Sequence, residues 1–145
     1  MGFVETNGKD ITFQFFFENE RVASIESFLS REPSECYIEA IEASTLIVLS
    51  KNDFDILVKQ FPEINEAIFQ LAMARFKHYA GLFRSFITHK PKDRYLELVK
   101  NDPRVIERIP QHYIASYLGI TPVSLSRIRN KIWRIGLRFP LFCIS

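Results

Sequence analysis

Residues 109–131 have the sequence IPQHYIASYLGITPVSLSRIRNK, which decides the fold because its helix-punctuating residues fall at fixed offsets. Pro110 falls at the start of a predicted helix, where the backbone N–H that proline lacks would have no partner within the helix. Gly119 can take the positive φ that ends a helix. Thr121 can cap a second helix, and Pro122 suits the first position of that helix. The spacing therefore predicts two short helices joined by a tight turn, the helix-turn-helix arrangement.

The side chains of this stretch divide into an apolar and a polar face. The predicted inward residues are Ile114, Ala115, Leu118, Ile120, Leu125 and Ile128. The predicted outward residues, two of them at the start of the first helix, are Val123, Ser124, Ser126, Arg127, Asn130, Lys131, Gln111 and His112. Such a face suits the phosphates and base edges of a DNA major groove, so we expect these residues to form a DNA-binding site. A helical corner that binds no DNA is the alternative.

Charge is distributed unevenly along the chain, although the net charge is only +2. Residues 1–66 contain thirteen acidic and five basic side chains, hence −8, and residues 67–145 carry +10. A basic C-terminal half suits a protein that presents one end to a polyanion. Two solvated faces that attract each other would give the same asymmetry, so charge alone does not decide between the two interpretations.

Residues 3–50 have the sequence patterns of strands. Asn7-Gly8 is a strong hairpin signal, because both residues tolerate positive φ, and residues 11–15 alternate apolar and polar side chains after it. Alternation returns over residues 36–41, and residues 45–49 form a short apolar run that is typical of a buried strand. We therefore expect an antiparallel β layer.

A long helix is predicted from about Pro62 to about Thr88, with Gly81 as a weak point. One apolar stripe steps by three or four residues through Phe69, Ala72, Phe76, Tyr79, Phe83 and Phe86. A neighbouring apolar face is formed by Ile64, Ile68, Leu71 and Leu82. A lone helix about 40 Å long cannot bury two such faces by itself. We expect one face to pack on the β layer and the other on a second copy, in a parallel homodimer; burial within a monomer is the alternative.

Shorter elements are expected between these segments. One helical turn is predicted over residues 24–29, and another short helix begins after Ser50, which is a suitable cap. A further helix is predicted over residues 92–100, because Asn101-Asp102-Pro103 ends it. Residues 104–108 are expected to form a polar connection.

The composition excludes several classes of protein. With 47% hydrophobic and 25% charged residues the chain is globular, and it has no apolar run of membrane-spanning length and no signal peptide, so we expect a cytoplasmic protein. Cys36 and Cys143 lie far apart and are interpreted as ordinary thiols. His78, His89 and His112 are isolated from other catalytic residue types. We therefore expect no enzyme activity, no metal and no cofactor.

Residues 111–128 resemble the DNA-binding segment of the Crp/Fnr family of bacterial regulators, the relatives of the cyclic AMP receptor protein. The order of β layer, long helix and helix-turn-helix resembles that family over nearly the whole chain, and residues 7–17 are similar to members from Bacteroidetes. The resemblance implies an α+β fold in three parts. These are a partial antiparallel β-roll of the cyclic-nucleotide-binding kind (1–61), a dimerisation helix (62–89) and a helix-turn-helix domain with a reduced or absent wing (90–145).

The resemblance also implies partners and residue roles. The partners are duplex DNA, a second copy of the chain and RNA polymerase. Arg127 and Ser126 fall where family members read bases, and Ser124 falls where they contact a phosphate. Pro122 and Val123 occupy two further base-facing places, where they can touch thymine methyls but cannot donate hydrogen bonds. We therefore expect specificity to depend on Arg127 and on DNA shape.

Three departures from the family limit what is expected. The places of its nucleotide-binding residues hold Ala23, Ser24, Ser34 and Glu35, and no phosphate-binding arginine stands among them. Arg31 or Arg21 could substitute, but Glu35 would repel the anion, so we do not expect cyclic AMP to bind as in the family. Residues 1–50 supply too few strands for a complete roll, so its N-terminal portion is expected to be absent. Residues 132–143 are expected to cap the core rather than form the wing.

The leading hypothesis is a homodimeric, sequence-specific DNA-binding transcription regulator that does not respond to cyclic AMP in the family's manner. The alternative is a ligand-sensing or partner-binding module whose DNA contacts have decayed. Binding to duplex DNA at low salt distinguishes the two.

Overall fold

The structure is a computed structural model that describes residues 2–6 and 9–134. The chain divides into two compact units. The first unit combines residues 1–22, 35–41 and 90–145, and the second combines residues 23–34 and 42–89. The first 61 residues contribute to both units.

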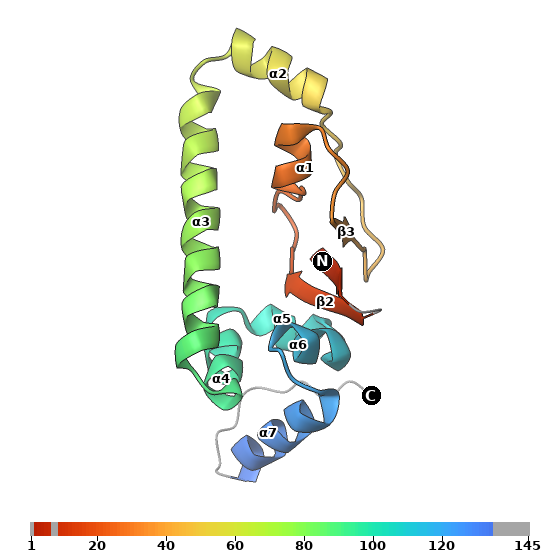
Figure 1. Cartoon of the computed structure of the whole chain (residues 1–145), viewed down its shortest axis with the longest axis vertical. Helices are drawn as coiled ribbons and strands as arrows, with labels where there is room; N and C mark the ends of the chain where they lie inside the picture. The colour runs from red at the N-terminus through yellow and green to blue at the C-terminus, as the bar shows by residue number, and fades with distance from the viewer. Residues whose placement is uncertain (1, 7–8, 135–145) are drawn as a thin grey trace. The chain divides into compact units, whose positions relative to one another are not determined.

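Within the described residues, the first unit contains one small sheet and four helices, drawn as ribbons in Figure 1. Its strands are β1 (Gly2–Thr6), β2 (Lys9–Gln14) and β3 (Cys36–Ile38). Its helices are α4 (Pro91–Asn101), α5 (Pro103–Arg108), α6 (Gln111–Tyr117) and α7 (Pro122–Arg134). In the sheet, both neighbours of β1 are antiparallel to it, in the order β2-β1-β3. Thr6 pairs with Lys9; the predicted turn residues Asn7 and Gly8 lie outside the described residues.

The predicted fold class, an α+β fold with a partial β-roll, is wrong. Helices account for most of the described residues, and the strands in this part of the chain form a single three-stranded sheet rather than a roll. The predicted strand at residues 45–49 is absent, and Ile47 there is fully exposed. The predicted strand over residues 36–41 shrinks to the three residues of β3. A roll needs enough strands to close two sheet faces over a shared core, and three short strands do not provide them.

The core of the first unit comes from its helices and from the residues that join them. Its buried apolar side chains are Tyr95, Val99, Val105, Ile109, Ile114, Ala115, Leu118, Leu125 and Ile132. Residues 104–108, predicted as a polar connection, are instead α5, whose Val105 is buried in this core. Strand β2 joins the helices through Ser116 of α6: the backbone N–H of Thr12 donates to Ser116 Oγ (2.9 Å), and that hydroxyl donates to the Asp10 carbonyl (3.2 Å).

The segment after β2 is fixed to α5 by an aromatic ring and two ion pairs. The guanidinium carbon of Arg104 lies 4.1 Å from the centre of the Phe17 ring, and that of Arg108 lies 5.3 Å from it. Arg108 Nη2 contacts Glu18 Oε1 at 2.7 Å, and Arg104 Nη2 contacts Glu20 Oε1 at 3.5 Å. The hydrogen bond from Arg108 lowers the pKa of Glu18 to about 2. This exposed cluster therefore depends on ionised carboxylates.

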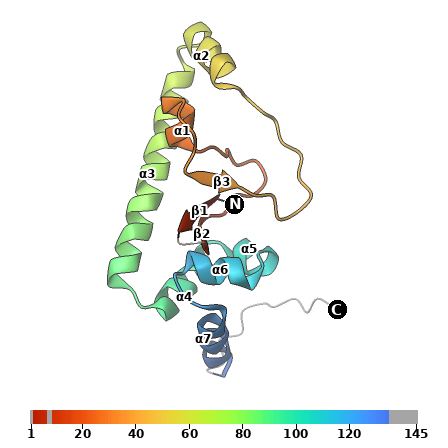
Figure 2. The same ribbon diagram turned by 45° about the vertical axis from the view of Figure 1, so that its right-hand side comes forward.

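The second unit contains three helices, α1 (Ile25–Ser30), α2 (Lys51–Gln60) and α3 (Ile64–Thr88), which Figure 2 shows in a turned view. Helix α2 begins where it was predicted to, since the Ser50 hydroxyl accepts a hydrogen bond from the Asp53 N–H (3.1 Å). Helix α3 is 25 residues long and continues through Gly81, but none of its residues is buried. Among the described residues, no helix combines the length and the apolar character needed to cross a bilayer.

Candidate nucleic-acid interface

The turn between α6 and α7 has the hydrogen bonds of a Schellman motif. Gly119 has a φ of 65°, as its role in ending the first helix requires. The Gly119 N–H donates to the Ser116 carbonyl (2.9 Å), and the Ile120 N–H donates to the Ala115 carbonyl (3.0 Å). These two bonds satisfy carbonyls that the end of a helix leaves without intrahelical donors. The backbone therefore makes the predicted sharp turn, and its exit direction is fixed.

Helix α7 begins with a side-chain cap. The Thr121 hydroxyl accepts a hydrogen bond from the Ser124 N–H (3.2 Å), and Pro122 occupies the first helical position. The Thr121 hydroxyl also lies 3.0 Å from Ser124 Oγ. Ser124 is half-buried and takes part in this cap, so it is less available for a DNA phosphate than the sequence predicts.

The inner face of α7 packs on α6 and the rest of the core. Leu125 and Ala115 are completely buried, and Ile132 is 2% exposed. Ile128 is half-buried and packs against the same cluster. Because Ala115 is small, the second helix can cross the first closely. The apolar residues predicted to face inward do so, which fixes the opposite face of α7 outward.

The outward face of α7 is exposed and basic. Five of its exposed residues are predicted DNA contacts: Val123, Ser126, Arg127, Asn130 and Lys131. Within the described part of the chain, Arg127 makes no ion pair that would neutralise it. No Asp or Glu follows Glu107 in the sequence, whereas Arg127 and Lys131 both lie on this face. This face therefore offers cationic donors without an acidic competitor on the same helix.

The two remaining predicted DNA contacts lie in the first turn of α6. Gln111 and His112 are both exposed there. The His112 ring lies 3.9 Å from the ring of Tyr113, centre to centre, at an angle of 42°. The Tyr113 hydroxyl donates to Glu39 Oε2 (3.2 Å), and this carboxylate adds to the effect of burial, which raises the pKa of Tyr113. His112 thus lies beside the Tyr113 ring, whose hydroxyl is hydrogen-bonded to Glu39 just after β3.

A side chain that the sequence did not single out reaches the turn from α4. Arg94 Nη2 donates to the carbonyl oxygen of Leu118 at 2.6 Å. Leu118 is the C-cap residue that directly follows α6, and it is 2% exposed. The contact spans 24 residues of sequence, and no local pattern announces it. The neighbouring Tyr95 is buried, and burial raises the pKa of its phenol; Arg129 of α7 acts in the opposite direction.

The predicted effector residues are divided between the two units, with Ala23, Ser24, Arg31 and Ser34 in the second and Glu35 in the first. Ser34 Oγ donates to Ser24 Oγ (2.8 Å) in the second unit, where Ala23 is exposed, whereas Glu35 belongs to the first unit. Arg31 ends α1 with a φ of 66°.

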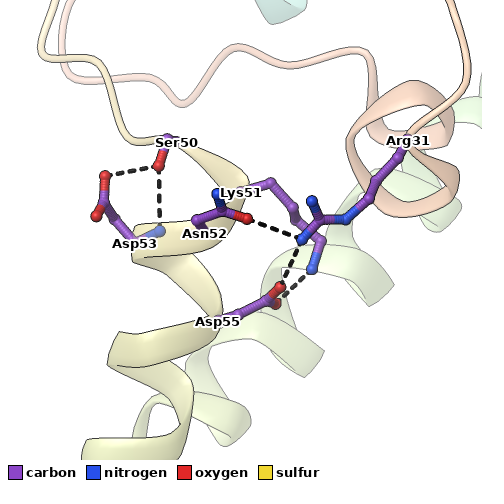
Figure 3. A network of polar contacts seen from close by, with 6 residues as sticks. All are labelled: Arg31, Ser50, Lys51, Asn52, Asp53 and Asp55. Carbon is purple, nitrogen blue, oxygen red and sulfur yellow. Dashed lines mark hydrogen bonds and ion pairs between the residues drawn. The ribbon is translucent and has the colours of Figure 1, made fainter.

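Arg31, a possible substitute for a phosphate-binding arginine, has its guanidinium bound to side chains of α2. Its Nη2 lies 3.0 Å from Asn52 Oδ1 and 3.3 Å from Asp55 Oδ2 (Figure 3). Lys51 contacts the same carboxylate, and the hydrogen bond from Lys51, more than that from Arg31, lowers the pKa of Asp55. The Lys51 ammonium also lies within 5.8 Å of the centres of the Phe28 and Phe54 rings. This network joins α1 to α2, which is a structural role.

The predicted dimer stripe on α3 is exposed. Phe69, Phe76 and Phe83 are 57%, 66% and 71% exposed, and they recur every seven residues. Ala72 and Tyr79 lie between them in the stripe and are exposed as well. Comparison with family models, curated proteins and solved structures finds no match to this chain. No group of three or more potential metal-ligating side chains occurs within the described residues.

Proposed function

We propose that this protein is a sequence-specific, duplex-DNA-binding transcription regulator. The observation that carries the proposal is the exposed, basic outer face of α7, held outward by the complete burial of Leu125 and by the Gly119 turn. The resemblance of residues 111–128 to Crp/Fnr regulators supports the same function. Such a regulator works where the bacterial chromosome is, in the cytoplasm, and acts on transcription by RNA polymerase.

In this proposal α7 lies in a major groove, which is about 12 Å wide and admits one helix. Arg127 donates two hydrogen bonds to a guanine edge, and Asn130 reads an adenine. Lys131 and Ser126 contact the flanking phosphates or bases, and Val123 touches a thymine methyl. Ser124, which caps the helix, contributes chiefly to the orientation of α7.

The proposed assembly is a homodimer formed through α3. The exposed phenylalanines with a seven-residue repeat support it, because such a stripe matches the seam of a two-stranded coiled coil. A two-fold dimer presents two α7 helices to half-sites about one helical turn apart, so the operator is expected to be palindromic.

The test begins with selection of binding sequences from a random duplex library, followed by affinity measurements on the selected site. The parent protein should bind the site, and the affinity should fall steeply as salt rises. Arg127→Ala should cost about 1 to 3 kcal/mol, roughly 5- to 150-fold in Kd, and should relax preference at one base pair.

Arg84→Ala, which removes a charge from α3, is the matched control and should leave Kd on the isolated site within about twofold. If Arg127→Ala binds as tightly as the parent, the assignment of Arg127 as the base-reading residue is wrong. If the parent binds no duplex at low salt, the partner-binding module is favoured instead.

A further inference from the structure

The Leu118 carbonyl lies in a buried part of the turn and needs a hydrogen-bond donor. The two bonds of the Schellman motif serve the carbonyls of Ala115 and Ser116, and neither serves Leu118. Leu118 is 2% exposed, so bulk water has little access to it. A buried carbonyl without a donor costs free energy comparable to a lost hydrogen bond. The donor here is the Arg94 guanidinium, at 2.6 Å.

An arginine suits this place for two physical reasons. The end of α6 carries the partial negative charge of the helix dipole, so a cation is favoured beside the Leu118 carbonyl. The guanidinium is also planar and rigid, so it fixes direction as well as distance, which the flexible ammonium of a lysine does not. Arg94 is half-buried and comes from α4, so the contact fastens the turn to a different helix of the core.

The neighbouring contacts of α4 point the same way. Tyr95 is buried in the core shared by α4 to α7, and Arg129 of α7 is close enough to influence the pKa of its phenol, which burial raises. Arg129 is half-buried, whereas Arg127 two residues earlier is exposed. Arg94 therefore contacts the turn and the next residue, Tyr95, interacts with the inner side of α7, while the outer side of α7 stays exposed.

We propose that Arg94 is a positioning residue for DNA recognition, which sets the direction of α7 by holding the Leu118 carbonyl without touching DNA itself. The inference rests on the proposed function of α7. A helix of 13 residues is about 20 Å long, so a tilt of only about 5° moves its far end by nearly 2 Å. Base-edge hydrogen bonds have a tolerance smaller than that displacement. Loss of the Arg94 contact therefore weakens base reading more than it weakens attraction to phosphates.

The first arm of the test measures DNA binding by Arg94→Gln, Arg94→Lys and the parent at several salt concentrations. Lys100→Gln is the matched control, because it removes one exposed positive charge from the same helix. Arg94→Gln should raise Kd for the selected site by roughly tenfold, with the slope of log Kd against log salt unchanged and the ratio of specific to non-specific affinity reduced.

Arg94→Lys should fail to restore the parent's specificity, since lysine keeps the charge but loses the planar fork. A direct phosphate contact predicts the opposite pattern, in which Arg94→Gln lowers the magnitude of the salt slope by about 0.9 and lysine restores binding. That result, or parent-like specificity in Arg94→Gln, would overturn the proposal.

The second arm needs no DNA. Amide hydrogen exchange at Gly119 and Ile120, resolved by NMR, should be roughly tenfold faster in Arg94→Gln than in Lys100→Gln, because these amides form the turn that Arg94 fastens. If exchange there is unchanged, Arg94 does not hold the turn, whatever the DNA result.

The two arms separate the two hypotheses. If the parent binds no duplex, the proposed function fails, and exchange still decides whether Arg94 fastens the turn. Should Arg94→Gln not fold, Arg94→Lys keeps the charge and the stem and is measured in the same two ways.

Discussion

Helices α7 and α3 each leave one face uncovered, and the two faces differ in chemistry. The inner side of α7 is buried on a core, and its exposed side carries Arg127, Asn130 and Lys131. Helix α3 has no buried residue, and its exposed stripe is made of phenylalanines. A cationic face suits binding to a polyanion, whereas an aromatic stripe suits packing against another apolar surface. The comparison teaches that α7 has a buried side that fixes its orientation within its own unit, whereas α3 has no such side; in the proposed homodimer a second copy covers its stripe.

Leu125→Ala tests the claim that α7 is held by its own core, and it has the largest expected effect. Removing a completely buried leucine should lower the free energy of unfolding of the first unit by about 2 to 5 kcal/mol. Urea denaturation followed by circular dichroism measures the change. Val123→Ala, on the exposed side of the same helix, is the control and should change stability by less than about 0.5 kcal/mol. Equal losses in the two variants would refute the described orientation of α7.

Phe76→Glu tests the claim that α3 requires a second copy. A charge in the middle of the proposed seam should weaken self-association by at least about 2 kcal/mol, roughly 30-fold in the dimer dissociation constant. Sedimentation equilibrium measures it. Lys77→Glu, at the next position of the helix and off the stripe, is the control. A parent protein that is monomeric at all concentrations would remove the homodimer from the proposal.

Two glycines sharpen the contrast between the units. Gly119→Ala forces a side chain into the left-handed region at φ 65° and should destabilise the first unit by about 1 to 2 kcal/mol. Gly81 lies within α3, and an added Cβ meets nothing within 4 Å. Gly81→Ala should therefore stabilise the second unit by about 0.5 to 1 kcal/mol. Thermal unfolding of both variants checks the opposite signs, and a shift of the same sign in both would contradict this account.

The smallest expected effect is on how the stability of the first unit depends on pH. Arg108 lowers the pKa of Glu18 from 4.5 to about 2. The ion pair therefore contributes to the free energy of unfolding above pH 4.5, and this contribution is lost as the pH falls towards 2. Glu18→Gln should therefore make the unfolding temperature of the first unit less dependent on pH in that window. Glu26→Gln, an exposed position in α1, is the control. A pH profile that Glu18→Gln leaves unchanged would show that this ion pair contributes nothing measurable.

The helix-turn-helix could be predicted because its signals are local. Gly119, Thr121 and Pro122 act on residues within four positions of themselves, and the structure shows the turn, the cap and the helix start that they predict. Ser124 was predicted to face DNA, but its amide lies three residues after a capping threonine. The capping rule already predicted that contact.

The antiparallel pairing of β1 with β2 follows from the local Asn7-Gly8 signal, but the pairing of β1 with β3 and the Arg94 contact could not be predicted, because both depend on residues distant in sequence. β1 pairs with β3 more than thirty residues further along the chain, and the apolar run at residues 45–49 forms no strand. Alternating side chains show that a strand can form, but they do not identify its neighbour. Helix α5 was missed because only Val105 of its six residues is buried, too few for a helical period to show.

The lack of acidic residues after Glu107 has a consequence for the order of assembly. Under the proposed function, the two copies of this segment lie about one helical turn of DNA apart, which exceeds the roughly 10 Å over which charges interact at 0.1 M salt. They therefore repel each other little, while the phosphates attract each copy with no acidic side chain in the segment to offset the attraction. Added salt weakens that attraction but not the packing of an apolar seam. The proposed pairing of the chains should therefore persist in salt that releases them from DNA.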